Sequence, residues 1–178
     1  ELNPDLRAAG AARAAGRAET HSPEARTAPA KTMVDLSGLP KDGAVLWGNR
    51  RGPRLVVFSD FQCGYCQRLT GELEAAAVLV EERPISIFGA SSRRMSEGVL
   101  CAKDKAKALH AAYAGRAPSA PANCDVGEAL DTNEAFARAN GFAGTPVIVR
   151  ASDGAVLHGY RDAATLRKFA NAKPGGRK

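Results

Sequence analysis

Residues 55–66 read Leu55-Val56-Val57-Phe58-Ser59-Asp60-Phe61-Gln62-Cys63-Gly64-Tyr65-Cys66. The apolar run from Leu55 ends in polar residues at Asp60, which is typical of a central strand buried on both faces. From Gly64 onward, apolar residues recur at three- and four-residue spacing, which indicates an amphipathic helix running to about Glu82. This stretch therefore predicts a buried strand that leads directly into a helix, with two cysteines at the junction.

The spacing of Cys63 and Cys66 at the start of a helix is typical of a redox-active dithiol. Unpaired N–H groups and the helix dipole stabilise a thiolate there, so we expect Cys63, as the exposed first residue, to be the nucleophile. Cys66, one turn inward, would resolve the mixed disulfide. Half of a zinc site is the alternative, but the other cysteines lie far apart and no histidine has matching spacing. We therefore predict no metal and no cofactor.

Thr145-Pro146 stands immediately before a short apolar run. A proline is normally excluded from a strand ladder, so a cis bond at a turn is one interpretation. Such a turn beside the thiols would present a backbone edge to an incoming substrate strand. The alternative is a simple boundary between a loop and a strand.

Cys101 and Cys124 flank a loop rich in alanine and proline. A structural disulfide fits this pair best, and two separate buried thiols are the alternative. By closing the loop between the two cysteines, a disulfide would stabilise the fold by roughly 3 kcal/mol. Because cytosolic thiols are kept reduced, a disulfide favours an oxidising compartment, and the bacterial periplasm is the leading candidate.

The rest of the chain predicts an alternation of strands and helices. We expect Trp47, Phe58, Phe61, Phe88 and Phe136 in the core. The expected strands are 44–47, 55–60, 85–88, 147–149 and 155–157, and the expected helices are 64–82, 92–114, 126–140 and a last one capped by Asp162. This order resembles an α/β thioredoxin-like fold with an inserted helical subdomain.

Composition divides the chain into three segments. Residues 1–32 are rich in alanine and arginine, with Leu2 and Leu6 as their only large aliphatic side chains, so we expect a flexible tail or linker. Residues 33–173 form the expected catalytic domain, and residues 174–178 the expected disordered C-terminus. No apolar run approaches the roughly 18 residues needed to cross a bilayer.

The net charge of +6 is not evidence for nucleic-acid binding. Binding needs a clustered basic patch, yet Lys173, Arg177 and Lys178 supply half of the excess at the chain terminus. The three histidines, His21, His110 and His158, are isolated in the sequence. We therefore expect no nucleic-acid partner and no catalytic histidine.

Four ordered segments carry a resemblance to a known family. The chain resembles the catalytic domain of the DsbC/DsbG family of periplasmic thiol:disulfide interchange proteins, and most closely its DsbC branch. The match covers roughly residues 44–172. Its segments are Val57–Cys66, Cys101–Ala108, Ala120–Val126 and Gly144–Pro146.

The resemblance implies a role for each of these motifs. Cys63 would be the nucleophile and Cys66 the resolving thiol, and Cys101–Cys124 would be a structural disulfide. The residues next to the thiols would be Gly64, Tyr65, Thr145 and a cis-Pro146. A threonine before this proline is similar to the isomerase and reductase branch of the family. The implied activity is disulfide isomerase or reductase on disulfide-containing client proteins in the periplasm, with a DsbD-like membrane protein as reductant.

One departure from the family bears on function. Family members typically carry an N-terminal dimerisation domain, whereas only residues 1–32 precede the domain in this sequence, so we expect a monomer. A monomer would meet oxidising partners freely, which makes a thiol oxidase or a dedicated client-specific reductant an alternative. A peptide-binding chaperone module with incidental thiols is an alternative of another class.

Overall fold

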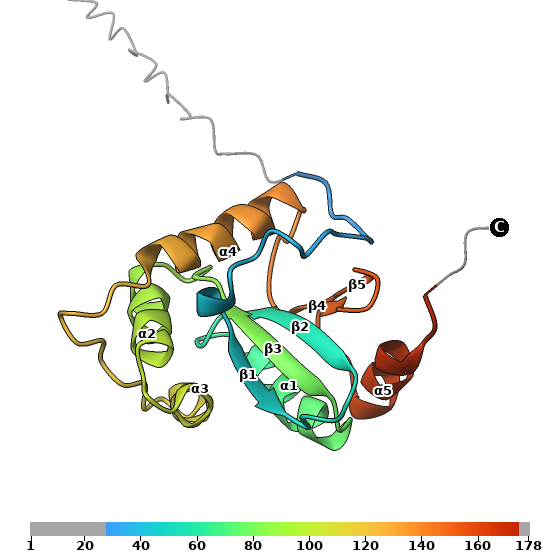
Figure 1. Ribbon diagram of the computed structural model, residues 1–178, viewed down its shortest axis with the longest axis horizontal. Coiled ribbons are helices and arrows are strands. Elements are labelled where there is room, and N and C mark those ends of the chain that lie inside the picture. The colour runs from blue at the N-terminus through green and yellow to red at the C-terminus, as the bar shows by residue number, and fades with distance from the viewer. Residues whose placement is uncertain (1–27, 175–178) are drawn as a thin grey trace, which may run out of the picture.

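A computed structural model describes residues 28–174, in which one five-stranded sheet is flanked by helices (Figure 1). The order of strands and helices agrees with the predicted α/β order. The elements are the 3₁₀ turn η1 (Lys41–Gly43), β1 (Val45–Gly48), β2 (Arg54–Ser59), α1 (Gly64–Ala75), β3 (Leu79–Pro84), α2 (Ala90–Leu100), α3 (Lys105–Tyr113), α4 (Gly127–Ala139), β4 (Val147–Arg150), β5 (Val156–His158) and α5 (Ala163–Asn171). No helix within residues 28–174 is long and apolar enough to cross a membrane.

The central strand of the sheet is β2, in the strand order β1-β3-β2-β4-β5. It pairs parallel with β3 and antiparallel with β4. Successive side chains of a strand point to opposite faces. Leu55 and Val57 accordingly join a core with α1, α3 and α5, while Val56 and Phe58 join a second core with α4. The predicted burial of this strand on both faces is confirmed.

The third strand lies earlier in the chain than predicted. Helix α1 ends at Ala75, and Ala77 takes the left-handed conformation with φ of 55°, so the helix expected to reach Glu82 is too long. Residues 79–84 then form β3, whereas the predicted strand 85–88 is a loop. Apolar spacing suggested a longer helix because the chain reverses at an alanine and not at a glycine.

The helical stretch expected over 92–114 is two helices, α2 and α3. The chain breaks between Cys101 and Asp104, and the Asp104 carboxylate accepts a hydrogen bond from the N–H of Lys107 at 3.0 Å. Aspartate at an N-cap satisfies a backbone donor that the helix itself cannot. The two helices contact each other and extend one side of the sheet beyond β1 (Figure 1).

Residues 28–34, which we name the strap, lie against α4 and β5. Ala28 and Lys31 donate backbone hydrogen bonds to α4 and to the residue after it, and Thr32 accepts one from Val156. A Cβ at Gly141 would meet the strap at 2.2 Å from the Pro29 carbonyl oxygen. The strap therefore packs where only a glycine leaves room. Residues 28–32 belong to the segment predicted as a flexible tail, and residues 1–27 and 175–178 lie outside the described residues.

Candidate active site

The two cysteines meet at the carboxyl end of the central strand. Cys63 is the N-cap of α1, and its Sγ accepts a hydrogen bond from the Cys66 N–H at 3.3 Å. The Cys63 thiol also lies 3.6 Å from the Thr145 carbonyl oxygen, to which it can donate. Neither cysteine is bridged. A sulfur that caps a helix N-terminus is well placed to carry negative charge.

Cys63 is less accessible than predicted. Only 6% of its surface is exposed, so the expectation of an exposed first cysteine is wrong. The segment containing Thr145 covers it, because that segment reaches the thiol across the end of the sheet.

Cys66 differs from Cys63 in its electrostatic surroundings. It is 2% exposed, and burial raises the pKa of its thiol well above the ordinary value, with the neighbouring Cys63 sulfur adding to the effect. A buried group favours its neutral form when no positive charge compensates. Cys66 is thus held as a protonated thiol, while Cys63 occupies the helix terminus.

The predicted turn at Pro146 lies beside these thiols. The Thr145–Pro146 peptide bond is cis, as one of the two interpretations predicted, and β4 begins at the next residue. Val147 pairs with Phe58 near the carboxyl end of β2, which places the turn at the same end of the sheet as Cys63. The structure thus brings Cys63, Cys66, Thr145 and Pro146 together, with Gly64 and Tyr65 in the first turn of α1.

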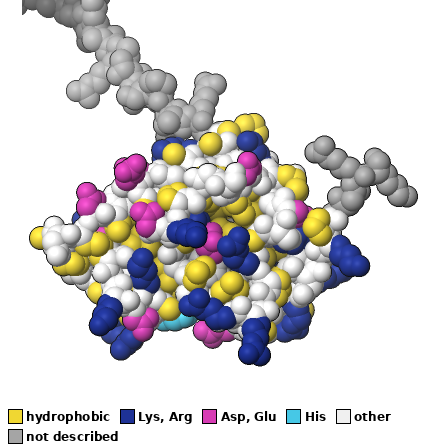
Figure 2. All heavy atoms as spheres, viewed as in Figure 1, with side chains coloured by type: hydrophobic (Ala, Val, Ile, Leu, Met, Phe, Trp, Pro, Cys, Tyr) yellow, Lys and Arg dark blue, Asp and Glu magenta, His cyan; other side chains and the backbone are white. Residues whose placement is uncertain are grey.

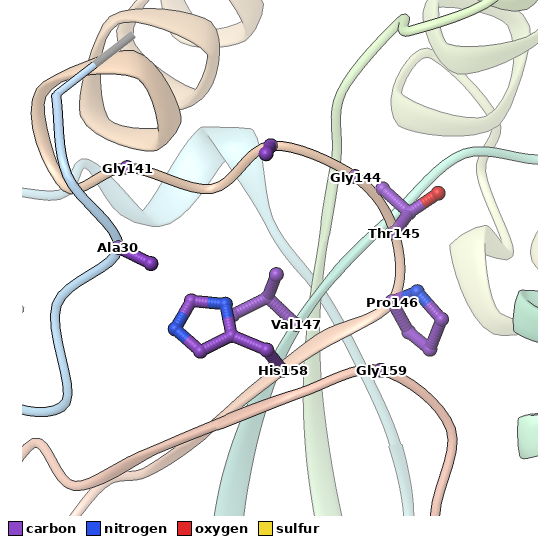
Figure 3. Close-up of a pocket in the computed structure, with 9 residues that line it drawn as sticks. Ala30, Gly141, Gly144, Thr145, Pro146, Val147, His158 and Gly159 are labelled. Atoms are coloured by element: carbon purple, nitrogen blue, oxygen red, sulfur yellow. The ribbon is translucent and has the colours of Figure 1, made fainter.

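A cavity of about 410 Å³ adjoins this turn. Figure 3 shows Ala30 of the strap facing His158, with Pro146 across the opening. The His158 ring lies 2.9 Å from the Lys31 carbonyl oxygen, so the strap and β5 together form one wall. The remaining lining is mostly small, at Gly141, Ala143, Gly144, Val147 and Gly159.

Asp60 organises the junction and was not singled out from the sequence. Its carboxylate is fully buried and accepts hydrogen bonds from the N–H of Gln62 at 2.8 Å and the Ser92 hydroxyl at 2.7 Å. Its second oxygen accepts one from the N–H of Phe88 at 3.2 Å. One side chain thereby joins the end of β2 to the loop that enters α2. The available signal was a carboxylate at the end of an apolar run.

A second buried carboxyl, Glu82 on β3, was also missed. It accepts hydrogen bonds from Trp47 Nε1 at 2.7 Å, from the Ser59 hydroxyl at 2.8 Å and from the Tyr113 hydroxyl. Burial raises the pKa of Glu82, although these donors oppose the shift. Burial and the Glu82 charge likewise raise the pKa of Tyr113. No local pattern pointed to this carboxyl, because the strand that carries it was predicted at residues 85–88.

Exposed apolar side chains lie in the first turn of α1 and in the loop after β3, where the Phe88 N–H reaches Asp60. Tyr65 is 59% exposed, and Phe88 and Ile87 are exposed in the loop after β3. Phe88 was expected in the core, and that expectation is wrong because β3 ends at Pro84 and leaves the aromatic ring beyond the sheet. Exposed apolar groups beside a reactive group suit contact with another polypeptide.

The remaining two cysteines form a disulfide away from the thiols. Cys101 and Cys124 are bridged, as predicted, with Cα atoms 6.0 Å apart. The bridge closes the segment that runs from the end of α2 through α3 to the approach of α4. Among residues 28–174, no three histidine, cysteine or acidic side chains gather as metal ligands.

On the face in Figure 2, acidic side chains lie among the lysines and arginines.

The fold and the dithiol at the start of α1 are those of thioredoxin-like proteins. Residues 43–173 match the family described as "Thioredoxin-like domain", and the chain belongs to this family.

Curated relatives narrow the resemblance. The chain is 33% identical over 142 residues to the thiol:disulfide interchange protein DsbC of Salmonella typhimurium and 32% identical to that of Escherichia coli. Each alignment covers 77% of this chain and 58% of the relative, so the chain spans little more than half the length of these proteins.

Solved structures agree on the fold. A disulfide interchange protein from Neisseria gonorrhoeae superposes with a TM-score of 0.61 at 29% identity, covering 74% of this chain and 96% of that one. A periplasmic thioredoxin-like protein from Salmonella enterica gives a TM-score of 0.59 at 21% identity, covering 72% of this chain and 90% of the other. The second likeness bears on the fold alone.

Proposed function

We propose that the chain is a thiol:disulfide interchange protein that reduces and isomerises disulfides of client proteins in the periplasm. The observation that carries the proposal is the Cys63 sulfur at the N-cap of α1, facing the backbone of Thr145 beside a cis-proline. The likeness to DsbC proteins and the Cys101–Cys124 disulfide support the activity and the oxidising compartment.

The two cysteines would divide the reaction between them. The Cys63 thiolate attacks one sulfur of a client disulfide, that bond breaks, and the other client sulfur leaves as a thiolate that takes a proton. Cys66 then loses its proton and attacks the Cys63 sulfur, which releases the second client thiol and leaves a Cys63–Cys66 disulfide. In isomerisation, a different client thiolate attacks the mixed disulfide instead, which forms a new client disulfide and releases Cys63 as a thiolate.

Repeated reduction requires an electron donor. A DsbD-like membrane reductant would return the Cys63–Cys66 disulfide to two thiols. We propose that the chain acts as a monomer, because the described residues supply the complete dithiol site from one chain.

The test compares the wild type with Cys63→Ser in insulin reduction and in refolding of a scrambled multi-disulfide protein. We expect the variant to lose both activities, while Cys66→Ser accumulates a mixed disulfide on Cys63. Equal activity of the wild type and Cys63→Ser contradicts the proposal. In periplasmic extracts, the Cys63–Cys66 pair should be found reduced, since an oxidised pair would indicate a thiol oxidase.

A further inference from the structure

A second cavity begins one residue before the proposed nucleophile. It has a volume of about 400 Å³ and lies between α2 and residues 117–120. Gln62 lines one end, where its side-chain amide donates to the Ser91 hydroxyl at 2.6 Å. Because adjacent Cα atoms are about 3.8 Å apart, a polypeptide bound at Cys63 lies within reach of this cavity.

The far wall of the cavity is held in place by two independent features. The disulfide between Cys101 and Cys124 encloses the segment that contains residues 117–120. Gly98 of α2 packs directly against it, because a Cβ at Gly98 would lie 1.7 Å from the Pro118 carbonyl oxygen. The loop that forms this wall is therefore enclosed by the disulfide and packs closely on α2.

The two adjacent arginines of α2 differ in their partners. Arg93 is engaged by Glu97 at 3.4 Å, by Asp131 at 2.9 Å and by the Gly127 carbonyl oxygen at 3.0 Å. Arg94 is exposed, lines the cavity, and forms neither an ion pair nor a side-chain hydrogen bond with any of residues 28–174. Glu97 also lines the cavity, but its carboxylate already faces Arg93. Arg94 is thus the cation left free for a ligand.

We propose that this cavity receives an acidic side chain of the client polypeptide and that Arg94 recognises it. The inference rests on the proposed function, since the client must be held at Cys63. A guanidinium presents paired N–H donors that match a carboxylate, whereas it offers nothing to a lysine side chain. The site therefore favours client disulfides with aspartate or glutamate close to the attacked cysteine.

The test uses synthetic peptides that contain one disulfide and differ only in a Glu, Gln or Lys near one cysteine. We expect the wild type to reduce the Glu peptide with a kcat/KM about three- to fivefold above that of the Lys peptide, mainly through KM, since an exposed ion pair has a modest effect. The preference should fade at high salt. Arg94→Gln should abolish the preference, and Arg94→Glu should reverse it.

Arg50→Glu is the matched control for Arg94→Glu. Arg50 is exposed in the turn between β1 and β2, and its substitution changes the net charge by the same amount. It should keep the wild-type preference. If the wild type reduces the Glu, Gln and Lys peptides at equal rates, or if Arg94→Glu still prefers the Glu peptide, the inference is overturned while the proposed function stands. If the wild type reduces none of the peptides, the inference and the proposed function are both overturned.

Discussion

At the scale of single residues, the two thiols and the two buried carboxyls have contrasting environments. Cys63 caps a helix, whereas burial raises the pKa of Cys66 and keeps its proton in place. Asp60 receives two donors from the surrounding loops and one from Ser92 of α2, and Glu82 receives three from side chains. Buried carboxyl groups persist in a fold when such donors compensate for lost hydration.

Glu82→Gln tests the effect of this burial on pH-dependent stability. Because burial raises the pKa of Glu82, its contribution to stability is fully present below the ordinary carboxyl value of about 4.3 and is lost as pH rises through the raised value. Between those values, the wild type should lose about 1.4 kcal/mol per pH unit relative to the neutral variant. Urea unfolding at a series of pH values measures this difference.

The glutamine is a fair isostere at this site, because its oxygen can accept from Trp47 and its amide can donate to the Ser59 hydroxyl. Glu74→Gln, at an exposed position of α1, reports the effect of removing a surface carboxyl. Parallel stability curves for the wild type and Glu82→Gln would contradict the prediction.

At the scale of elements, the connection between α1 and β3 contains the only non-glycine residue of positive φ among residues 28–174. Ala77 takes this conformation in an exposed position. Left-handed backbone costs a residue with a Cβ about 1 kcal/mol, which glycine does not lose.

Ala77→Gly should therefore raise the free energy of unfolding by about 1 kcal/mol and the melting temperature by about 2–4 °C. Ala75→Gly, two residues earlier within α1, is the control and should lower stability by roughly 0.5–1 kcal/mol. Thermal unfolding of the three proteins decides between them, and destabilisation by Ala77→Gly would refute the argument.

The elements that could be predicted from the sequence are those marked by a local pattern. Strand β2 was predictable because four apolar residues lead into a cysteine pair, and α5 because Asp162 caps it. Strand β3 was not, because Glu81, Glu82 and Arg83 become compatible with a sheet only through partners far away in the sequence. The burial of Cys63 depends on Thr145, which no local pattern places beside it.

At the scale of the whole molecule, the strap completes the sheet edge at β5. Met33 forms a bridge with Ala155, and Val34 donates to the Gly154 carbonyl oxygen at 2.9 Å. An uncovered edge strand is a template for pairing with another chain. Residues 28–34 are thus part of the folded domain as well as a wall of the cavity beside Pro146.

A chain starting at residue 35 should be less stable than one starting at residue 28 by roughly 2–4 kcal/mol, because several backbone hydrogen bonds of about 1 kcal/mol each are lost. It should also self-associate through β5. Urea unfolding and size-exclusion chromatography measure the two effects, and the chain starting at residue 28 is the control. Equal stability and equal elution of both chains would count against a structural role for the strap.

The Cys101–Cys124 bridge makes the protein a product of the kind of chemistry proposed for it. Forming this bond removes two electrons from a pair of thiols 23 positions apart, whereas Cys63 and Cys66 are free thiols in the structure. A reduced dithiol cannot accept those electrons, so a different oxidant must act on each new molecule first. Formation of the Cys101–Cys124 bridge therefore requires an oxidant other than the reduced dithiol of this chain, and production under reducing conditions should yield a chain with four thiols.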